Sequence, residues 1–188
     1  MDSNLLAQDN SVLLIIDVQS KLLAAMSPEH SQAVTRYSAI LAEAADLLNI
    51  PVLVTEQYPK GLGATDEVII AKLPQPTQIV SKTSFSCCQA TSFMQALSSS
   101  QRQHIILTGM EAHICVLQTA LDLHQQGYQI SVVADAVCSR NPEHKFYALQ
   151  RLQHQGITIT NHESVLFEWL KDAAHPEFKR ISALLPKG

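Results

Sequence analysis

The chain has 188 residues, 46% of them hydrophobic, which suits one compact domain over residues 1–188 with a continuous core. The formal net charge of -4 and the pI near 6.0 leave no basic excess to follow a phosphate backbone, so we expect no nucleic acid partner. No stretch reaches the ~18 apolar residues of a membrane span, and the polar N-terminal segment lacks a signal-peptide pattern. We therefore expect a soluble, cytoplasmic protein with no membrane partner.

Apolar runs typical of strands alternate along the chain with segments of helical periodicity. The expected strands are 11–17, 51–56, 77–82, 104–108, 129–134 and 157–160. The expected helices are 31–48, 66–72, 89–97, 115–126, 143–155 and 163–173, with an amphipathic tail from Pro176. Because no hairpin signals separate the strands, this order predicts right-handed βαβ units and a six-stranded parallel sheet covered on both faces, an α/β fold.

Three side chains with useful chemistry stand just after strands, where ligands bind in a parallel sheet. Asp17 follows the first strand, Lys82 ends the third, and Cys115 comes just after the fourth, at the start of a helix. Each has a simpler explanation: Asp17 as a turn cap, Lys82 as a solvated charge and Cys115 as a small buried hydrophobe. Together, a carboxylate, an ammonium and a thiol at one sheet edge predict a nucleophilic site.

The expected chemistry is nucleophilic catalysis by a thiol. The ammonium and the free N–H groups of a first helical turn favour a thiolate, and those N–H groups can stabilise an oxyanion. The carboxylate can accept the thiol proton and return it to a leaving group.

Three ordered motifs resemble the isochorismatase-like cysteine hydrolases, which include nicotinamidases and N-carbamoylsarcosine amidohydrolases. They are D-V-Q at 17–19, K-T-S-F-S at 82–86 and G-M-E-A-H-I-C-V at 109–116, within a resemblance that runs from about residue 11 to about residue 170. The strings T-E-Q-Y-P-K-G-L-G from Thr55 and V-A-D-A-V-C-S-R from Val133 look closest to the isochorismatase domain-containing branch.

The resemblance implies a three-layer α/β/α Rossmann-like sandwich and a catalytic triad of Asp17, Lys82 and Cys115. It also implies a non-proline cis peptide at Met110–Glu111, and an oxyanion hole formed by the backbone N–H groups of Glu111 and Cys115. With a cysteine present, we expect hydrolysis of a small amide, ureido or related C–N or C–O substrate through a thioester, rather than vinyl ether cleavage.

The chain departs from the nicotinamidase pattern at the metal site. Nicotinamidases carry a D-x-H motif after the second strand, whereas here that segment reads E-Q-Y-P-K-G-L-G and the next histidine is His104. We therefore expect no metal and no cofactor, and nicotinamide is not the expected natural substrate. The four cysteines also lack the paired C-x-x-C spacing of a structural zinc site.

Five further residues are candidates for shaping the substrate pocket, because they follow strands or lie in the motif loops. They are Gln19, Gln57, Tyr58, Phe85 and His113. Core packing explains Phe85 equally well, and a turn hydrogen bond to the backbone explains His113 equally well.

A second class of function stays open at this stage. The chain can be a catalytically silent oligomeric interaction protein, or a thiol redox sensor that pairs Cys115 with Cys87 or Cys88. The resemblance implies a homo-oligomer, and the apolar tail from Phe178 either packs across a subunit boundary or folds back on its own sheet.

Overall fold

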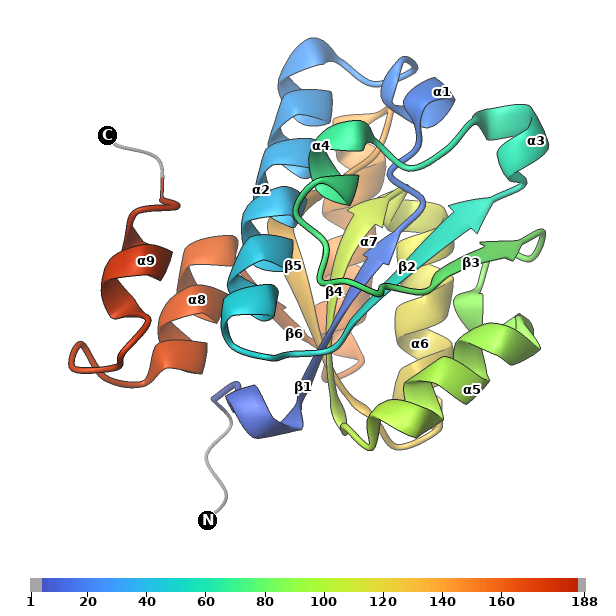
Figure 1. Cartoon of the computed structure of the whole chain (residues 1–188). Coiled ribbons are helices and arrows are strands. Elements are labelled where there is room, and N and C mark those ends of the chain that lie inside the picture. The colour runs from blue at the N-terminus through green and yellow to red at the C-terminus, as the bar shows by residue number, and fades with distance from the viewer. Residues whose placement is uncertain (1–4, 186–188) are drawn as a thin grey trace.

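The computed structural model describes residues 5–185 as a parallel sheet between two layers of helices (Figure 1). The six strands pair in the order β3-β2-β1-β4-β5-β6, and every neighbouring pair is parallel. They are β1 (Ser11–Ile16), β2 (Val52–Gln57), β3 (Ile79–Lys82), β4 (His104–Met110), β5 (Gln129–Cys138) and β6 (Thr158–Thr160). The predicted α/β sandwich is confirmed.

Helices cover both faces of this sheet. They are α1 (Ser20–Leu23), α2 (Pro28–Leu47), α3 (Pro59–Leu62), α4 (Glu67–Ile70), α5 (Thr91–Ser100), α6 (Leu117–Gln125), α7 (Pro142–His154), α8 (His162–Leu170) and α9 (Phe178–Ser182). Shorter turns are η1 (Gln8–Asn10), η2 (Cys87–Gln89) and η3 (Ala112–Val116). The helices α2 and α8 pack on one face, and α5, α6 and α7 pack on the other.

The central strands are buried on both faces, which explains their unbroken apolar sequence. Every residue of β1 and of β4 is buried. In the edge strand β3, by contrast, exposed and buried residues alternate, and Ile79 is 40% exposed. The core is therefore two apolar layers, one on each side of the sheet.

Two element boundaries differ from the predicted ones for identifiable reasons. Helix α2 begins at Pro28 rather than at residue 31, because the Ser27 side chain accepts the His30 N–H and the proline suits the first helical position. Strand β5 continues past residue 134 to Cys138, because an irregularity in its pairing with β4 admits extra residues.

The turn after β4 also differs from the prediction, and it carries Cys115. Helix α6 begins at Leu117, and Cys115 lies inside the preceding π-helical turn η3 rather than at the start of a regular helix. Gly109 brings this turn close to the end of β1. Its φ is +113°, and an added Cβ would lie 2.0 Å from the carbonyl oxygen of Ile16, so only glycine fits.

The C-terminal segment folds back on its own chain. Ile181 of α9 is 1% exposed, and Phe178, Leu184 and Leu185 pack against the core on the α2 side. The last tail residue of the predicted apolar run, Pro186, lies outside the described residues. No helix within residues 5–185 combines the length and the apolar character that crossing a membrane would require.

Candidate active site

A buried ion pair joins the carboxyl ends of β1 and β3. The Lys82 Nζ lies 2.7 Å from Asp17 Oδ2, and both side chains are 0% exposed. Lys82 also donates to Gln57 Oε1 at 2.7 Å and to the backbone carbonyls of Ser84 and Phe85, each at 3.2 Å. Burying two charges is costly unless hydrogen bonds satisfy them, and here the ammonium is fully engaged.

Thr55 of β2 holds the carboxylate from the other side. Its hydroxyl donates to Asp17 Oδ1 at 2.7 Å, and its carbonyl oxygen accepts the Asp17 N–H at 3.1 Å. Asp17 has a φ of 54°, in the left-handed region that residues other than glycine seldom adopt. Such backbone conformations concentrate at functional sites, where the surroundings hold them in place.

Cys115 is coupled to this ion pair. The residue is 6% exposed, and the charges of both Asp17 and Lys82 act on its thiol. Burial is the largest cause that raises the pKa of the Cys115 thiol, the negative charge of Asp17 raises it further, and Lys82 opposes both. Asp17 and Lys82 thus lie together at one sheet edge, and the catalytic role of Cys115 beside them stays a prediction.

The direction of this pKa shift corrects one expectation. The sequence predicted that Lys82 and a helical first turn would favour a thiolate, but the raised pKa of Cys115 means a neutral thiol at rest. The physical reason is burial of the thiol, to which the negative charge of Asp17 adds, and the Lys82 charge does not outweigh these two effects. A thiolate must therefore form by transfer of the proton to a base.

Lys82 keeps its charge in this environment. Burial alone would lower the pKa of the Lys82 ammonium, but the Asp17 carboxylate raises it above the ordinary value, with smaller contributions from Cys87 and Cys115. The Lys82 side chain is therefore charged at neutral pH.

The backbone before Cys115 has the conformation that the family resemblance implied. The Met110–Glu111 peptide bond is cis. The Glu111 carboxylate accepts the backbone N–H of Arg140 at 2.9 Å and its Nε at 3.2 Å. Burial would raise the pKa of Glu111, but these hydrogen bonds and the Arg140 charge lower it. The oxyanion hole formed by the N–H groups of Glu111 and Cys115 stays a prediction.

Two of the predicted substrate contacts, Gln19 and Gln57, brace the ion pair, and their contact with a substrate stays a prediction. Gln19 is 0% exposed, its amide donates to the carbonyls of Gln57 and Gly63 at 3.1 and 2.6 Å, and its Oε1 accepts the Gln57 N–H at 2.7 Å. The Gln57 side chain in turn accepts from Lys82 and donates to the Thr83 carbonyl at 2.7 Å. Their contacts are thus with the chain itself.

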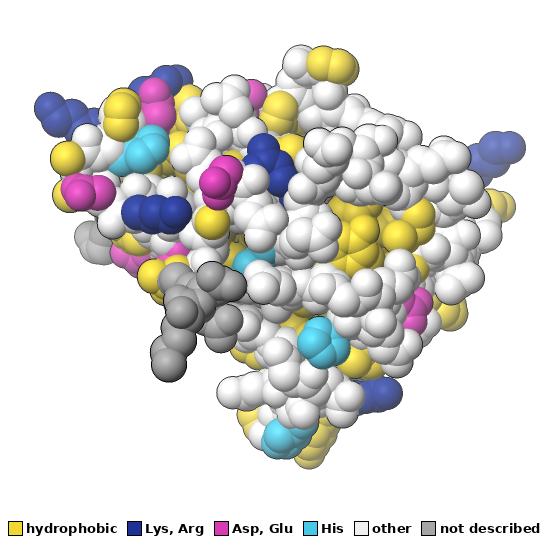
Figure 2. All heavy atoms as spheres, turned by 90° about the horizontal axis from the view of Figure 1, so that it is seen from below, with side chains coloured by type: hydrophobic (Ala, Val, Ile, Leu, Met, Phe, Trp, Pro, Cys, Tyr) yellow, Lys and Arg dark blue, Asp and Glu magenta, His cyan; other side chains and the backbone are white. Residues whose placement is uncertain are grey.

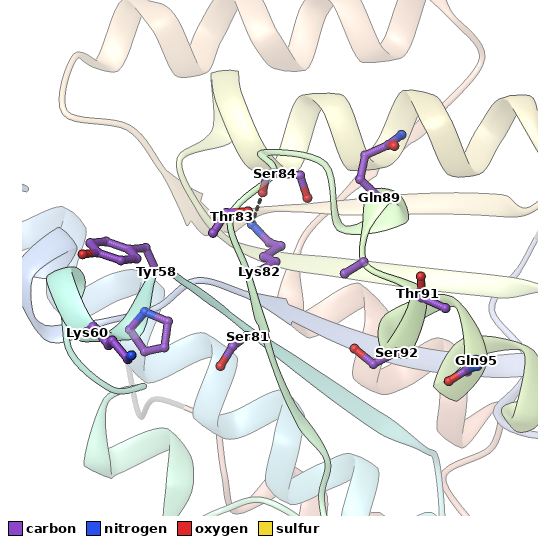
Figure 3. Close-up of a pocket in the computed structure, with 12 residues that line it drawn as sticks. Tyr58, Lys60, Ser81, Lys82, Thr83, Ser84, Gln89, Thr91, Ser92 and Gln95 are labelled. Carbon is purple, nitrogen blue, oxygen red and sulfur yellow. Dashed lines mark hydrogen bonds between the residues drawn. The ribbon is translucent and has the colours of Figure 1, made fainter.

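Tyr58 and Phe85 lie at the surface beside the ion pair. They are 55% and 54% exposed. Tyr58 lines a cavity of about 850 Å³ at the edge of β3, together with Lys82, Ser84 and small polar residues of α5 (Figure 3). Figure 3 shows the Lys82 ammonium turned toward the Ser84 carbonyl. The cavity does not include Cys115.

His113 lies in the turn η3, two residues before Cys115. Its Nδ1 is 2.9 Å from Ser139 Oγ, and its ring lies against that of His144 with centroids 4.8 Å apart. Both histidines line a separate cavity of about 260 Å³ between α6 and α7. A substrate contact by His113, like those by Tyr58 and Phe85, stays a prediction.

Glu56 lies in the segment where nicotinamidases carry the D-x-H metal motif, and its carboxylate already accepts hydrogen bonds from the chain. Glu56 Oε1 accepts the Thr65 N–H at 2.7 Å and the Thr65 hydroxyl at 2.8 Å. Within residues 5–185, no group of three or more His, Cys, Asp or Glu side chains is arranged to hold a metal ion. Metal-independent activity stays a prediction.

Thr55 was not among the residues predicted for the site, and Cys87 was considered only as a possible redox partner of Cys115. Cys87 is 0% exposed, and its Sγ lies 3.7 Å from the Thr55 hydroxyl. A hydroxyl residue two positions before Gln57 in a buried strand was the available signal, but the pattern does not reveal which face of β2 it occupies.

The geometry defines a class: an α/β protein with a buried carboxylate–ammonium pair at the carboxyl ends of its parallel strands and a buried thiol in the turn after β4. The chain belongs to the isochorismatase family, because the family model of the isochorismatase domain matches residues 11–164. It is 39% identical to isochorismatase domain-containing protein 2 of Danio rerio over 180 residues, which cover 96% of this chain and 89% of the relative. It is 36% identical to isochorismatase family protein 1B of Dictyostelium discoideum over 180 residues, covering 92% and 84%.

A solved structure described as MAR1 ribonuclease from Caenorhabditis elegans is also similar. It is 36% identical, covers 96% of this chain and 91% of its own, and superposes with a TM-score of 0.90. The expectation of no nucleic acid partner therefore needs a direct test. On the face seen from the amino ends of the strands, charged side chains of both signs are scattered rather than gathered in a basic patch (Figure 2).

Proposed function

We propose that the protein is a cysteine hydrolase in which Asp17, Lys82 and Cys115 act as one unit. The observation that carries this proposal is the buried Asp17–Lys82 pair, whose charges act on the buried Cys115 thiol. An inert structural thiol has no need of two buried, mutually neutralising charges beside it, since burying them lowers stability unless they are well satisfied.

The proposed reaction begins with transfer of the Cys115 proton to Asp17, because the resting thiol is neutral. The thiolate attacks a carbonyl carbon, and the backbone N–H groups of Glu111 and Cys115 stabilise the oxyanion. Asp17 then gives its proton to the leaving amine, and water hydrolyses the thioester. Lys82 holds the carboxylate in place and limits the build-up of negative charge.

The proposed substrates are small amides, ureido acids or related C–N and C–O compounds. A thiol forms a covalent acyl intermediate with such carbonyl carbons, whereas cleavage of a vinyl ether needs no nucleophile of this kind. The proposed site uses neither metal nor cofactor, since acid, base and nucleophile are all side chains.

The test is a screen of small amides, ureido acids, isochorismate, nicotinamide and a single-stranded RNA oligonucleotide. We expect wild type to hydrolyse a C–N compound, and Cys115→Ala to lose at least about a thousandfold in turnover, because the nucleophile is removed. Cys138→Ala is the matched control, since that thiol is also buried but lies outside the site. Full activity of Cys115→Ala on the same compound would contradict the proposal.

The thiol chemistry argues against the redox-sensor alternative. Sensor cysteines have depressed pKa values and are accessible. Here burial raises the pKa of the Cys87 thiol to about 12 and that of the Cys88 thiol to about 11, and the pKa of Cys115 is raised as well. All four cysteines are free, which supports the predicted cytoplasmic location.

We also expect the protein to form homo-oligomers, as the family resemblance implies. Several large apolar side chains are exposed in the isolated chain, including Phe146 and Tyr147 of α7, which are 55% and 63% exposed and contact one another edge to face. Such side chains are available for a subunit contact.

A further inference from the structure

Thr55 contacts Asp17 through both its side chain and its backbone. The hydroxyl donates to Asp17 Oδ1 at 2.7 Å, and the carbonyl oxygen accepts the Asp17 N–H at 3.1 Å. Both residues are 0% exposed, so water cannot replace either hydrogen bond. With Lys82 on Oδ2 and Thr55 on Oδ1, each carboxylate oxygen has one fixed donor.

Cys87 approaches the same hydroxyl from the other side. Its thiol donates to Thr55 Oγ1 at a Sγ–Oγ1 distance of 3.7 Å. Its backbone N–H donates to the hydroxyl of Thr119 at 3.0 Å, and Thr119 lies on α6, one helical turn after Cys115. Cys87 is thus fixed to the helix that follows the nucleophile turn.

A hydroxyl has one proton to donate and can accept others. Because the Cys87 S–H donates to Thr55 Oγ1, the Thr55 proton is left to point at Asp17. The hydrogen bonds from Cys87 to Thr55 and from Thr55 to Asp17 therefore run in one direction and end at the carboxylate, whose charge acts on the Cys115 thiol.

We propose that Thr55 is a positioning residue for Asp17 and that the thiol of Cys87 fixes the direction of the Thr55 hydroxyl. The proposal rests on the proposed role of Asp17 as the base that takes the Cys115 proton. It gives Cys87 a part in the site that requires no change of oxidation state.

The substitution Thr55→Val keeps the shape of the side chain and removes the donor. The Asp17 carboxylate is then less stabilised, so the proton shared between Cys115 and Asp17 shifts toward Asp17 and the thiolate fraction rises. One lost charge-assisted hydrogen bond corresponds to about tenfold in this equilibrium. Turnover falls about tenfold, because Asp17 then gives its proton to the leaving group less readily.

The experiment labels each cysteine with iodoacetamide at pH 7 and follows the rates by peptide mass spectrometry. The Cys115 thiolate sulfur forms a bond to the methylene carbon of the reagent, and iodide leaves. We expect Cys115 to react about tenfold faster in Thr55→Val than in wild type, and at the wild-type rate in Thr55→Ser. Cys138, which is buried and outside these contacts, reports any general opening of the fold.

Three further variants complete the design. Thr108→Val removes another fully buried hydroxyl, one that bonds Ser38 on the α2 side of the sheet, and should leave Cys115 labelling unchanged. Cys87→Ala should raise Cys115 labelling about threefold, since a thiol is a weak donor, and Cys87→Ser should restore the wild-type rate.

The proposal would be overturned if Cys115 were labelled at the wild-type rate in Thr55→Val. It would also be overturned if the labelling of Cys115 and of Cys138 were accelerated equally in that variant. A Cys115 rate in Cys87→Ala equal to that of wild type would overturn the part assigned to Cys87. If the labelling rates change as expected but wild type hydrolyses no compound of the panel, the positioning role stands and the proposed hydrolase function fails.

Discussion

Replacing Asp17 with asparagine is expected to make Cys115 react faster with iodoacetamide at neutral pH and, at the same time, to reduce turnover by about 10²–10⁴-fold. Asp17 raises the pKa of the Cys115 thiol through its charge and its hydrogen bond, and Lys82 lowers it. Without the carboxylate charge the thiol pKa falls, so the midpoint of labelling moves to lower pH. Turnover is lost because no base remains to move the proton.

The matched control for this variant is Asp122→Asn. Asp122 accepts a hydrogen bond from the Ser86 hydroxyl at 2.6 Å but is not among the groups that shift the pKa of Cys115. The pH dependence of Cys115 labelling in Asp122→Asn should equal that of wild type. Circular dichroism should show that both variants are folded at the assay temperature. A Cys115 labelling midpoint that stays at the wild-type pH in Asp17→Asn would contradict the coupling of thiol and carboxylate.

Replacing Lys82 with methionine is expected to lower the free energy of unfolding at pH 7 by about 3–5 kcal/mol, because it leaves the buried Asp17 charge unpaired. Urea denaturation measures this difference. In wild type the pKa of Lys82 is raised on folding, so its contribution is complete below about pH 10.4, the unfolded value, and is lost as the pH rises through the folded value. The difference in the free energy of unfolding between wild type and Lys82→Met should therefore become smaller above about pH 10.4.

Lys72→Met provides the comparison at an exposed ion pair. Lys72 Nζ lies 2.8 Å from Glu43 Oε2, with side chains 43% and 33% exposed, and such pairs contribute about 0–1 kcal/mol. If Lys82→Met lowered the free energy of unfolding no more than Lys72→Met does, the Asp17 charge would not depend on Lys82 for its stability, and the prediction would be wrong.

The fold and the meeting of Asp17 with Lys82 could be predicted because they depend on order along the chain. Strand–helix alternation fixes a parallel sheet, and in a parallel sheet every strand end lies at the same edge. Asp17 and Lys82 follow different strands, so their side chains were expected together, and they lie 2.7 Å apart. The motif around Cys115 placed the thiol just after β4.

The state of the thiol could not be predicted from residue types alone. It depends on how burial and two opposite charges sum at one atom, and the sequence gives neither the depth of Cys115 nor the pairing of Lys82 with Asp17. The same limit applies to Gln19, whose type suits a substrate contact but whose amide is used within the chain. The extension of β5 depended on a pairing irregularity that leaves no local signal.

The most direct test of the account is mass spectrometry of wild type quenched with acid during turnover of a compound that the screen identifies. A thioester on Cys115 predicts an added mass equal to the acyl group of that compound. The added mass should lie on the peptide that contains Cys115 and be missing from Cys115→Ala. Continued hydrolysis by Cys115→Ala at the wild-type rate, with no adduct in wild type, would contradict the account.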